Sequence, residues 1–347
     1  MIFRREDFIL CNVPVAEGYP QSQTHCGVAT TNDRLLLTAS PYPVPVNTRL
    51  CIYTKVALRK LTCGLLFPPG KPADSYENPF IYIGEGVLGA NPITNFKLIR
   101  TKPLMDTPDP YNGIPAFNSD PDIFIEKDNI YVLNRVFVSI TPDRDYYSGY
   151  KVLLYLIEGV LENMSFKLKK ILLLKEFSNK QVASPCLFKK DGLYRLVQID
   201  TNSYNDGITF NGIYLLEGKS IDDLRESNNW HILKLYKPDE LLPWHMSVFQ
   251  ENGKFYSIVS CVKRGQKERC WQMIGSFNES LTELRISDIP LTDYKSYRSS
   301  AYIKDDLFYL YNTTVNEKID GSTSVDGRDI LVACKSFRDV KQQAGLT

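Results

Sequence analysis

The chain has 347 residues with 41 basic and 40 acidic side chains, so its formal net charge is only +1. Proteins that bind nucleic acid through its phosphates carry a marked excess of basic charge, so nucleic acid is excluded as an expected partner. Hydrophobic residues make up 43% of the chain, which is ordinary for a folded protein. Its 21 Tyr, 17 Phe, 20 Gly and 20 Pro favour short strands joined by tight turns.

Nothing in the sequence indicates export or membrane insertion. No apolar segment reaches the roughly 18 residues that a membrane-spanning helix needs. The charged residues at 4–7 interrupt the only stretch that resembles a secretory signal. The basic segment FKLKKILLLK (166–175) fits an exposed edge strand protected by lysines better than a helix lying on a membrane. We therefore expect a soluble protein without a signal peptide or a membrane partner, cytoplasmic or virion-associated.

Eight cysteines are scattered without a C-x-x-C pair or a Cys/His cluster at zinc-binding spacing. We expect free, buried thiols in a reducing compartment, and no residue is assigned as a metal ligand. The segment IGEGVLGA (83–90) lacks the strand, spacing and helix of a dinucleotide fingerprint, so it is interpreted as turns. No cofactor is therefore expected.

A hairpin pattern recurs five times along the chain. Each copy has an alternating strand, a turn at ND, KDN, KDG, ENG or KDD, and a second strand rich in aromatic and aliphatic residues. The copies are THCGVATTNDRLLLTASP (24–41), SDPDIFIEKDNIYVLNRV (119–136), ASPCLFKKDGLYRLVQID (183–200), WHMSVFQENGKFYSIVSC (244–261) and YRSSAYIKDDLFYLYNTT (297–314). A structural repeat of this size indicates a repetitive all-β architecture.

Between copies the chain is long enough for two more strands, for example in GYKVLLYLIEG (149–159). Helical periodicity is nearly absent; SIDDLRESNNW (220–230) is the best short candidate. A β-sandwich lacks such a recurrent first-strand motif, and α/β folds need crossover helices. We therefore predict one all-β domain, residues 1–347, folded as a five-bladed β-propeller of four-stranded antiparallel blades. EDFILCNV (6–13) and RDILVACKSF (328–337) are the candidate partners that close the ring.

In a propeller, the innermost strand of every blade starts near one end of the central channel, so side chains at equivalent positions converge there. These positions are occupied by His25, Asp120 with Asp122, Ser184, His245 and Arg298. Carboxylates, imidazoles and a guanidinium can bond sugar hydroxyls, and Trp244 and Tyr297 can stack on pyranose faces. The pattern predicts a carbohydrate site. The alternative is that these side chains only satisfy backbone groups at strand ends.

At these residues the sequence resembles the five-bladed β-propeller glycosidases of glycoside hydrolase families 43, 32 and 68. The resemblance depends on SDPDI (119–123), ASPCLFKKDGLY (183–194), WHMSVF (244–249), YRSSAY (297–302) and YENPFIY (76–82). It implies a base Asp on the first blade, an orienting Asp on the second and an acid Glu on the third. It also implies a structural calcium ion near a fourth-blade His, which His245 would reach through water.

Only the second-blade carboxylate of that pattern is matched, by Asp120. His25 stands at the position of the base, and Ala183 or Ser184 at that of the acid. Inverting hydrolysis needs two carboxyl groups about 6.5–9.5 Å apart across the scissile bond. Asp120 and Asp122 are expected on one face of one strand, so they do not form such a pair by default.

Glu77 becomes a replacement acid if its loop folds back towards the channel. Imidazole also transfers protons near neutral pH, so His25 with Asp120 can run proton-transfer chemistry. Asp120, His25 and Asp122 are therefore the candidate catalytic residues. The candidate substrate-binding residues are His245, Arg298, Trp244, Ser184, Tyr297 and Glu77.

Three functions follow from these patterns. The first is a carbohydrate-active enzyme of the glycoside hydrolase type that acts on a poly- or oligosaccharide. The second is a non-catalytic glycan-binding or structural propeller, such as a phage tail or receptor-binding module or an accessory protein of a polysaccharide gene cluster. The third is a scaffold that binds protein partners through its rim. The sugar, the linkage and the oligomeric state stay open.

Overall fold

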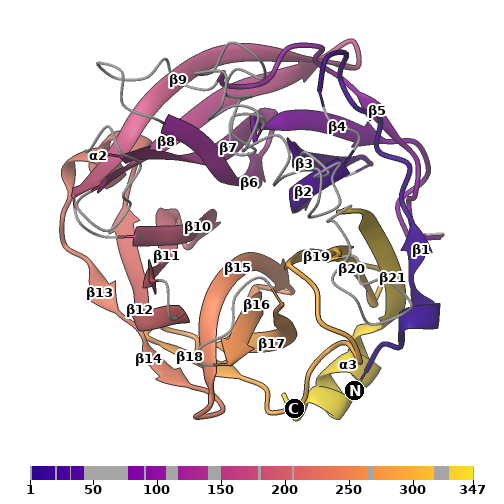
Figure 1. Cartoon of the computed structure of the whole chain (residues 1–347), viewed down its shortest axis with the longest axis vertical. Helices are drawn as coiled ribbons and strands as arrows, with labels where there is room; N and C mark the ends of the chain where they lie inside the picture. The colour runs from indigo at the N-terminus through magenta and orange to yellow at the C-terminus, as the bar shows by residue number, and fades with distance from the viewer. Residues whose placement is uncertain are drawn as a thin grey trace, which may run out of the picture.

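The computed structural model describes eleven parts of the chain: residues 2–19, 22–31, 33–42, 77–89, 91–106, 116–139, 150–178, 181–204, 207–263, 269–315 and 328–346. Within these residues the chain forms five sheets arranged radially around a common axis, as Figure 1 shows. Each predicted hairpin supplies the two inner strands of one sheet. The predicted five-bladed β-propeller is confirmed.

The first two blades are four-stranded antiparallel sheets. The first contains β2 (Ser22–Thr30), β3 (Leu35–Tyr42), β4 (Phe80–Gly84) and β5 (Phe96–Leu98). The second contains β6 (Ala116–Glu126), β7 (Asn129–Ser139), β8 (Tyr150–Glu162) and β9 (Ser165–Ser178). Strand β9 includes the basic segment 166–175 and forms the outer edge of its sheet, as predicted.

The third blade is again four-stranded, while the fourth has one strand more than predicted. The third contains β10 (Gln181–Lys190), β11 (Leu193–Tyr204), β12 (Gly207–Gly218) and β13 (His231–Ile232). The fourth contains β15 (Leu241–Glu251), β16 (Lys254–Lys263), β17 (Trp271–Phe277), β18 (Glu283–Ile286) and β14 (Lys234–Tyr236). Strand β14 runs parallel to β18, so the segment that links the two blades extends the outer edge of the fourth.

The fifth blade joins the two ends of the chain. It contains β19 (Arg298–Lys304), β20 (Leu307–Thr313), β21 (Ile330–Ser336) and the short β1 (Ile9–Leu10). Ile9 lies opposite Val332, and Leu10 opposite Leu331. This pairing is the ring closure expected between 6–13 and 328–337, and it places the first residues of the chain on the outside of the last blade (Figure 1).

The turns between inner strands have the backbone that their residues predict. Lys127, Asp191, Asn252 and Asp305 have φ between 48° and 55°. Tight hairpin turns whose twist matches the strands need positive φ, which Asn and Asp tolerate and glycine favours. The KDN, KDG, ENG and KDD motifs thus set the register of four inner hairpins.

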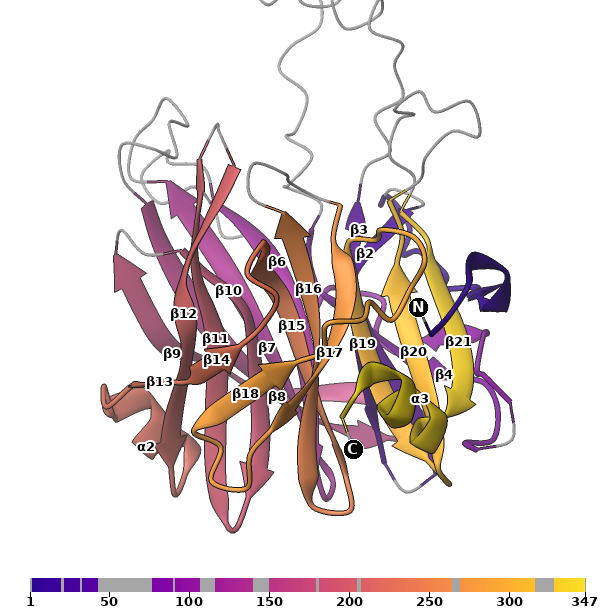
Figure 2. The same ribbon diagram turned by 90° about the horizontal axis from the view of Figure 1, so that it is seen from below.

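In the part of the chain that the structure describes, three helical segments accompany the sheets: η1 (Arg5–Asp7), α2 (Ile221–Glu226) and α3 (Phe337–Ala344). Helix α2 falls in the predicted segment 220–230 and begins at Ser220, whose side chain accepts a hydrogen bond from the Asp223 amide. Helix α3 was not predicted. It packs against the fourth and fifth blades through Phe337 and Val340 (Figure 2). No helix within the described ranges is both long and apolar enough to cross a membrane.

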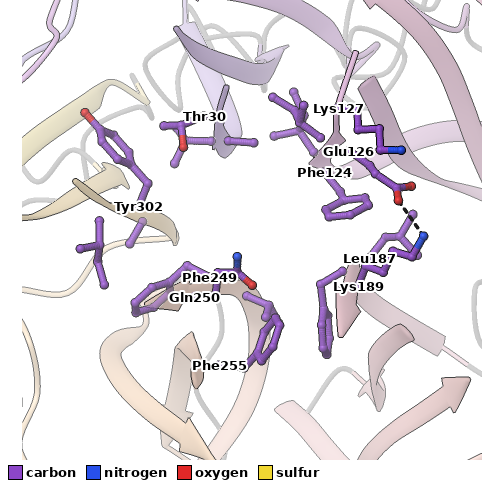
Figure 3. A pocket seen from close by; sticks show the side chains of 18 residues that line it. Thr30, Phe124, Glu126, Lys127, Leu187, Lys189, Phe249, Gln250, Phe255 and Tyr302 are labelled. Atoms are coloured by element: carbon purple, nitrogen blue, oxygen red, sulfur yellow. Dashed lines mark hydrogen bonds and ion pairs between the residues drawn. The ribbon is translucent and has the colours of Figure 1, made fainter. Parts of the chain in front are cut away.

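The hydrophobic core is divided among the interfaces between neighbouring blades. Tyr82 of the first blade packs with Tyr309 and Tyr311 of the fifth, and similar clusters fill the other four interfaces. The innermost strand of each blade therefore lines the propeller axis. Where these strands finish, the 18 residues drawn in Figure 3 line a cavity of about 410 Å³.

Candidate functional site

Four innermost strands carry a β-bulge near the start of their hairpin. The register shifts between residues 24 and 27, 119 and 122, 183 and 186, and 243 and 245. In the first three bulges His25, Asp120 and Ser184 have φ of 55°, 51° and 44°. Positive φ is uncommon for such residues and costs conformational energy, and a bulge turns a side chain away from the strand's alternation. The recurrent distortion directs equivalent side chains towards the axis.

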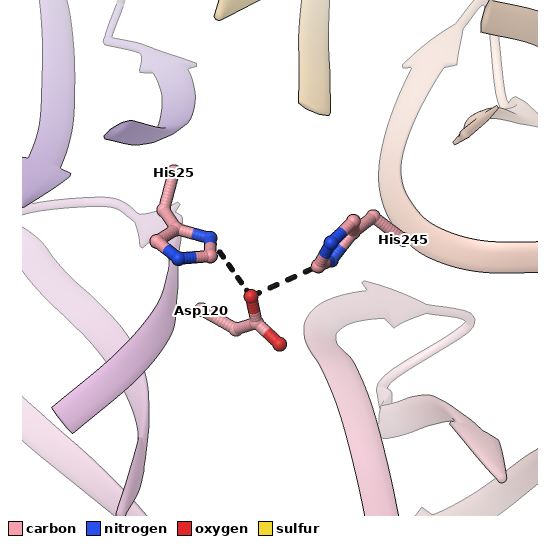
Figure 4. Close-up of side chains that lie close together, drawn as sticks. All are labelled: His25, Asp120 and His245. Carbon is pink, nitrogen blue, oxygen red and sulfur yellow. Dashed lines mark ion pairs between the residues drawn. The ribbon is translucent and has the colours of Figure 1, made fainter. Parts of the chain in front are cut away.

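The side chains of His25, Asp120 and His245 lie close together, as Figure 4 shows, and we call this group the His25–Asp120–His245 cluster. Asp120 Oδ1 lies 2.8 Å from His25 Nδ1 and 3.4 Å from His245 Nδ1. The three residues come from the first, second and fourth blades and are at most 1% exposed. The predicted convergence on the axis is confirmed for this cluster.

The second oxygen of Asp120 is held by other groups. Asp120 Oδ2 accepts a hydrogen bond from the Ser184 amide at 3.2 Å and lies 3.1 Å from Arg135 Nη2. Arg135, which the sequence did not indicate, lies on β7 directly opposite Ser119 and also donates to the Val182 carbonyl at 2.8 Å. Asp120 therefore has one anchored oxygen and one that faces the two imidazoles.

Arg298 contacts two carboxylates of β6, those of Asp120 and Asp122. Its Nη1 donates to the Pro121 carbonyl at 3.1 Å and lies 4.0 Å from Asp120 Oδ1, while its Nη2 is 3.4 Å from Asp122 Oδ1. Burial raises the pKa of Asp122 to about 6, although Arg298 opposes that shift. Because Arg298 is fully buried and bonded to the chain, it holds β6 in place in this structure.

Glu77 lies on the segment that leads into β4. Its Oε2 is 3.2 Å from His25 Nε2, so the side chain reaches the axis, which was the condition for its role as a replacement acid. His25 thus has a carboxylate at each ring nitrogen, Asp120 at Nδ1 and Glu77 at Nε2.

Two aromatic rings flank the cluster. Trp244 stacks on His245 with ring centroids 4.9 Å apart, and Tyr297 lies 4.9 Å from His245 and 5.1 Å from His25. The guanidinium of Arg328 lies 3.9 Å from the Tyr297 ring. Both aromatic residues assigned to substrate binding therefore adjoin the histidines, while Arg328 was not predicted.

Burial and the neighbouring charges determine the protonation states of Asp120 and His245. Burial raises the pKa of Asp120, but the nearby positive charge, that of Arg135 first, outweighs it and holds this pKa well below its usual value. Burial also lowers the pKa of His245 well below its usual value, against the opposing effect of Asp120. The site therefore combines an ionised carboxylate with a neutral imidazole near pH 7, and Asp120 is no proton donor.

The described residues do not suit the calcium ion that the resemblance implies. Calcium takes six to eight oxygen ligands, whereas the group that could bind an ion here consists of two imidazoles and one carboxylate, with the ligand atoms within 4.8 Å of one another. Such a donor set suits zinc and other divalent transition metals.

All nine predicted residues fall within one connected group of side chains. Ser184 joins through its hydroxyl, which lies 2.8 Å from His245 Nδ1. Their roles stay predictions. The sequence missed Arg135 and Arg328 because neither lies on an innermost strand or its bulge. The hairpin register could have found Arg135, since the position opposite Ser119 shares its face.

Comparisons with known proteins give a match in structure alone: no family model and no curated protein matches the sequence. An N-acetylgalactosamine deacetylase from F. plautii, in complex with blood group B trisaccharide, has a TM-score of 0.61 and 14% identity over 96% of this chain and 97% of its own. A xylan β-1,4-xylosidase from Bacillus halodurans C-125 has a TM-score of 0.61 and 13% identity over 92% of this chain and 54% of its own.

A third solved structure is a family 43 β-xylosidase/α-arabinofuranosidase from a compost microbial metagenome, in complex with xylotriose. It has a TM-score of 0.53 and 11% identity over 93% of this chain and 95% of its own. Because identity is low and coverage nearly complete, the likeness concerns the backbone. The chain has the five-bladed β-propeller fold that family 43 glycoside hydrolases also have.

Proposed function

We propose that this protein is a carbohydrate-active hydrolase, related in fold and mode of action to glycoside hydrolases, and that it binds a poly- or oligosaccharide at the His25–Asp120–His245 cluster. The observation that carries the proposal is the convergence of bulged, buried polar residues from four blades at one place on the axis. The similar structures with bound xylotriose and a blood group trisaccharide support a sugar as the ligand.

The acid–base chemistry centres on His25. Glu77 and Asp120 contact opposite nitrogens of its ring, so the imidazole lies between the two carboxylates. A glycosidic bond does not fit between carboxylates that already enclose a ring. Instead the ionised Asp120 orients His25, and Nε2, beside Glu77, exchanges a proton with substrate or water. This arrangement suits a hydrolysis in which His25 passes a proton between Glu77 and the substrate or water.

Substrate recognition falls to the aromatic rings beside the cluster. Trp244 is only half-buried, and its indole stacks on His245. Aromatic rings offer apolar area and a polar edge to a pyranose face. We assign Trp244 as the surface on which a sugar ring stacks. We assign Tyr297 as the residue that holds His25 and His245 in position.

A non-catalytic glycan-binding propeller is the second candidate. Ala183 or Ser184 stands where the family pattern has its acid Glu, and the Ser184 hydroxyl lies 2.8 Å from His245 Nδ1. A propeller that binds sugar without cleaving it would have the same fold and the same aromatic platform.

The test compares the wild-type protein with Asp120→Asn in a broad screen of poly- and oligosaccharides. We expect released sugar from at least one substrate, and a loss of turnover of about 10²-fold or more in the variant, the size typical of lost general acid–base catalysis. His231→Ala is the matched control, because His231 is the exposed third histidine on β13. Circular dichroism establishes that both variants fold.

Turnover that survives in folded Asp120→Asn would remove the cluster from the mechanism. Glycan-array binding with no product in any reaction would instead establish the non-catalytic alternative. Trp244→Ala separates recognition from chemistry, since it should weaken glycan binding in either case.

A further inference from the structure

We propose that His25, Asp120 and His245 form a binding site for one divalent transition-metal ion, with zinc the best match. This inference concerns the three side chains themselves and does not require that a carbohydrate be the substrate. The sequence assigned no metal ligand, and the family resemblance implied only a structural calcium ion that His245 would reach through water.

The first support is that each of the three residues has a buried polar atom without a hydrogen-bond partner. These atoms are His25 Nδ1, Asp120 Oδ1 and His245 Nε2. Buried polar groups are nearly always satisfied, so three orphaned atoms in one cluster need an explanation. A metal ion accepts lone pairs from all three kinds of atom.

The second support is distance. His25 Nδ1 and Asp120 Oδ1 lie 2.8 Å apart. Two atoms that each bind one zinc ion at about 2.0–2.2 Å are roughly 3.3–3.6 Å apart in a tetrahedral site. The ligand atoms of the three side chains lie within 4.8 Å of one another, so a small spreading of this pair lets all three reach one ion.

The third support is that the opposite atom of each side chain is already held. Glu77 lies 3.2 Å from His25 Nε2, and the Ser184 hydroxyl lies 2.8 Å from His245 Nδ1. Asp120 Oδ2 is held by the Ser184 amide and by Arg135. Such outer contacts fix the tautomer and orientation of metal ligands, and a carboxylate behind a ligating histidine is a recurrent form.

Charge and donor type define the ion. Three carboxylates, Glu77, Asp120 and Asp122, face two guanidinium groups, those of Arg135 and Arg298, so the contacts described leave an excess of negative charge for a cation. Two imidazoles with one carboxylate favour zinc over calcium or magnesium.

The ion would add a function that the side chains lack. Three protein ligands leave a further coordination position, where zinc can activate water or polarise a carbonyl. Without the ion, His25 and Asp120 are the proton-transfer pair of the proposed function. With it, they are ligands and Glu77 positions His25.

The experiment measures metal directly. The full-length protein is stripped with a chelator, and zinc binding is followed by calorimetry and by elemental analysis after dialysis. Cobalt(II) serves as a spectroscopic probe of imidazole coordination. We expect one ion per chain, at least about 100-fold weaker binding in His25→Ala and His245→Ala, and about 10- to 100-fold weaker binding in Glu77→Gln. His231→Ala should bind as the wild type does.

The proposal is overturned if the stripped protein binds no zinc, or if the stoichiometry and affinity survive in both His25→Ala and His245→Ala. It is also overturned if equimolar calcium displaces the zinc. Should an alanine variant fail to fold, Glu77→Gln supplies the same comparison from outside the ligand set. Zinc bound by a protein that releases no sugar would support this inference and contradict the proposed hydrolase.

Discussion

The two ends of the central channel are built from the same five innermost strands, yet they differ in backbone and in chemistry. Near their starts, β2, β6 and β10 are bulged and present His25, Asp120 and Ser184. Near their ends the pairing is regular, and the side chains line the 410 Å³ cavity of Figure 3. Backbone geometry and side-chain chemistry therefore differ between the start and the end of each innermost strand.

The cavity end is lined by both apolar and polar groups and contains one ion pair. Phe188 and Phe255 line it with ring centroids 4.8 Å apart, and Lys189 Nζ lies 2.6 Å from Glu126 Oε1. Among the residues that line the cavity, Tyr302 Oη alone is a buried side-chain atom without a hydrogen-bond partner, whereas three such atoms meet in the cluster. Unsatisfied groups and distorted backbone persist where a ligand or reaction uses them. The comparison therefore assigns chemistry to the bulged end and stability to the cavity end.

Arg298→Ala should have the largest effect on folding. It leaves Asp120 and Asp122 buried without the guanidinium that contacts both. Removing one partner of a buried ion pair typically costs about 3–5 kcal/mol. Urea unfolding measures the loss, and Arg298→Lys, which keeps the charge, should lose less. A loss below about 1 kcal/mol in Arg298→Ala would show that the bulged end does not depend on this residue.

Phe188→Ala tests the cavity end. Phe188 is 4% exposed and packs between the third and fourth blades, so its truncation should cost about 3 kcal/mol of unfolding free energy. Zinc affinity should not change, because the substitution is confined to the regular end of β10. Phe188→Leu, which fills more of the space, is the control and should lose less. A parallel loss of zinc binding would contradict the separation of the two ends.

The fold was predictable because its information is local and repeated. KDN, KDG, ENG and KDD demand hairpin turns, and the alternating residues on either side set which face is buried. Helix α3 and strand β14 were not predicted, since each is short and depends on contacts from distant blades. The equivalent positions of five hairpins then led to the ring of His25, Asp120, Ser184, His245 and Arg298.

The details of the site were less accessible, because they depend on distances between blades. The sequence placed Asp120 and Asp122 on one face of a strand, but the register shift between residues 119 and 122 interrupts the pairing there. The sequence also predicted that Arg298 binds substrate. In the structure the Arg298 guanidinium is buried and contacts Pro121 and Asp122. Contacts such as Glu77 with His25 join segments that no local pattern connects.

Gly27→Ala tests the close packing beneath the cluster with an intermediate effect. A Cβ at Gly27 would lie 2.8 Å from Thr38 Oγ1 and 3.3 Å from Asp122 Oδ1. Forcing an extra methyl group into a packed core costs about 1–3 kcal/mol, which thermal or urea unfolding would detect. Adding Thr38→Ala removes the shortest contact and should recover part of the loss. Wild-type stability in the single variant would show that the first two blades approach less closely.

Glu126→Gln should have the smallest effect, and its dependence on pH identifies its cause. Burial raises the pKa of Glu126, but hydrogen bonds from Lys189 and Tyr194 outweigh it, so this pKa lies below its ordinary value of 4.5. A carboxyl group with a lowered folded-state pKa stabilises the protein above its unfolded pKa, and that contribution is lost as the pH falls through the folded value.

The difference in unfolding free energy between the wild type and Glu126→Gln should therefore be below about 1 kcal/mol at pH 7, because the pair is partly exposed to solvent. It should shrink as the pH falls below 4.5, the ordinary pKa of the Glu side chain. Urea unfolding at pH 7 and pH 3 measures both values, with Lys189→Met as the matched control from the other side of the pair. A difference that stays constant with pH would mean that Glu126 acts through packing, and that the cavity end does not depend on this charge.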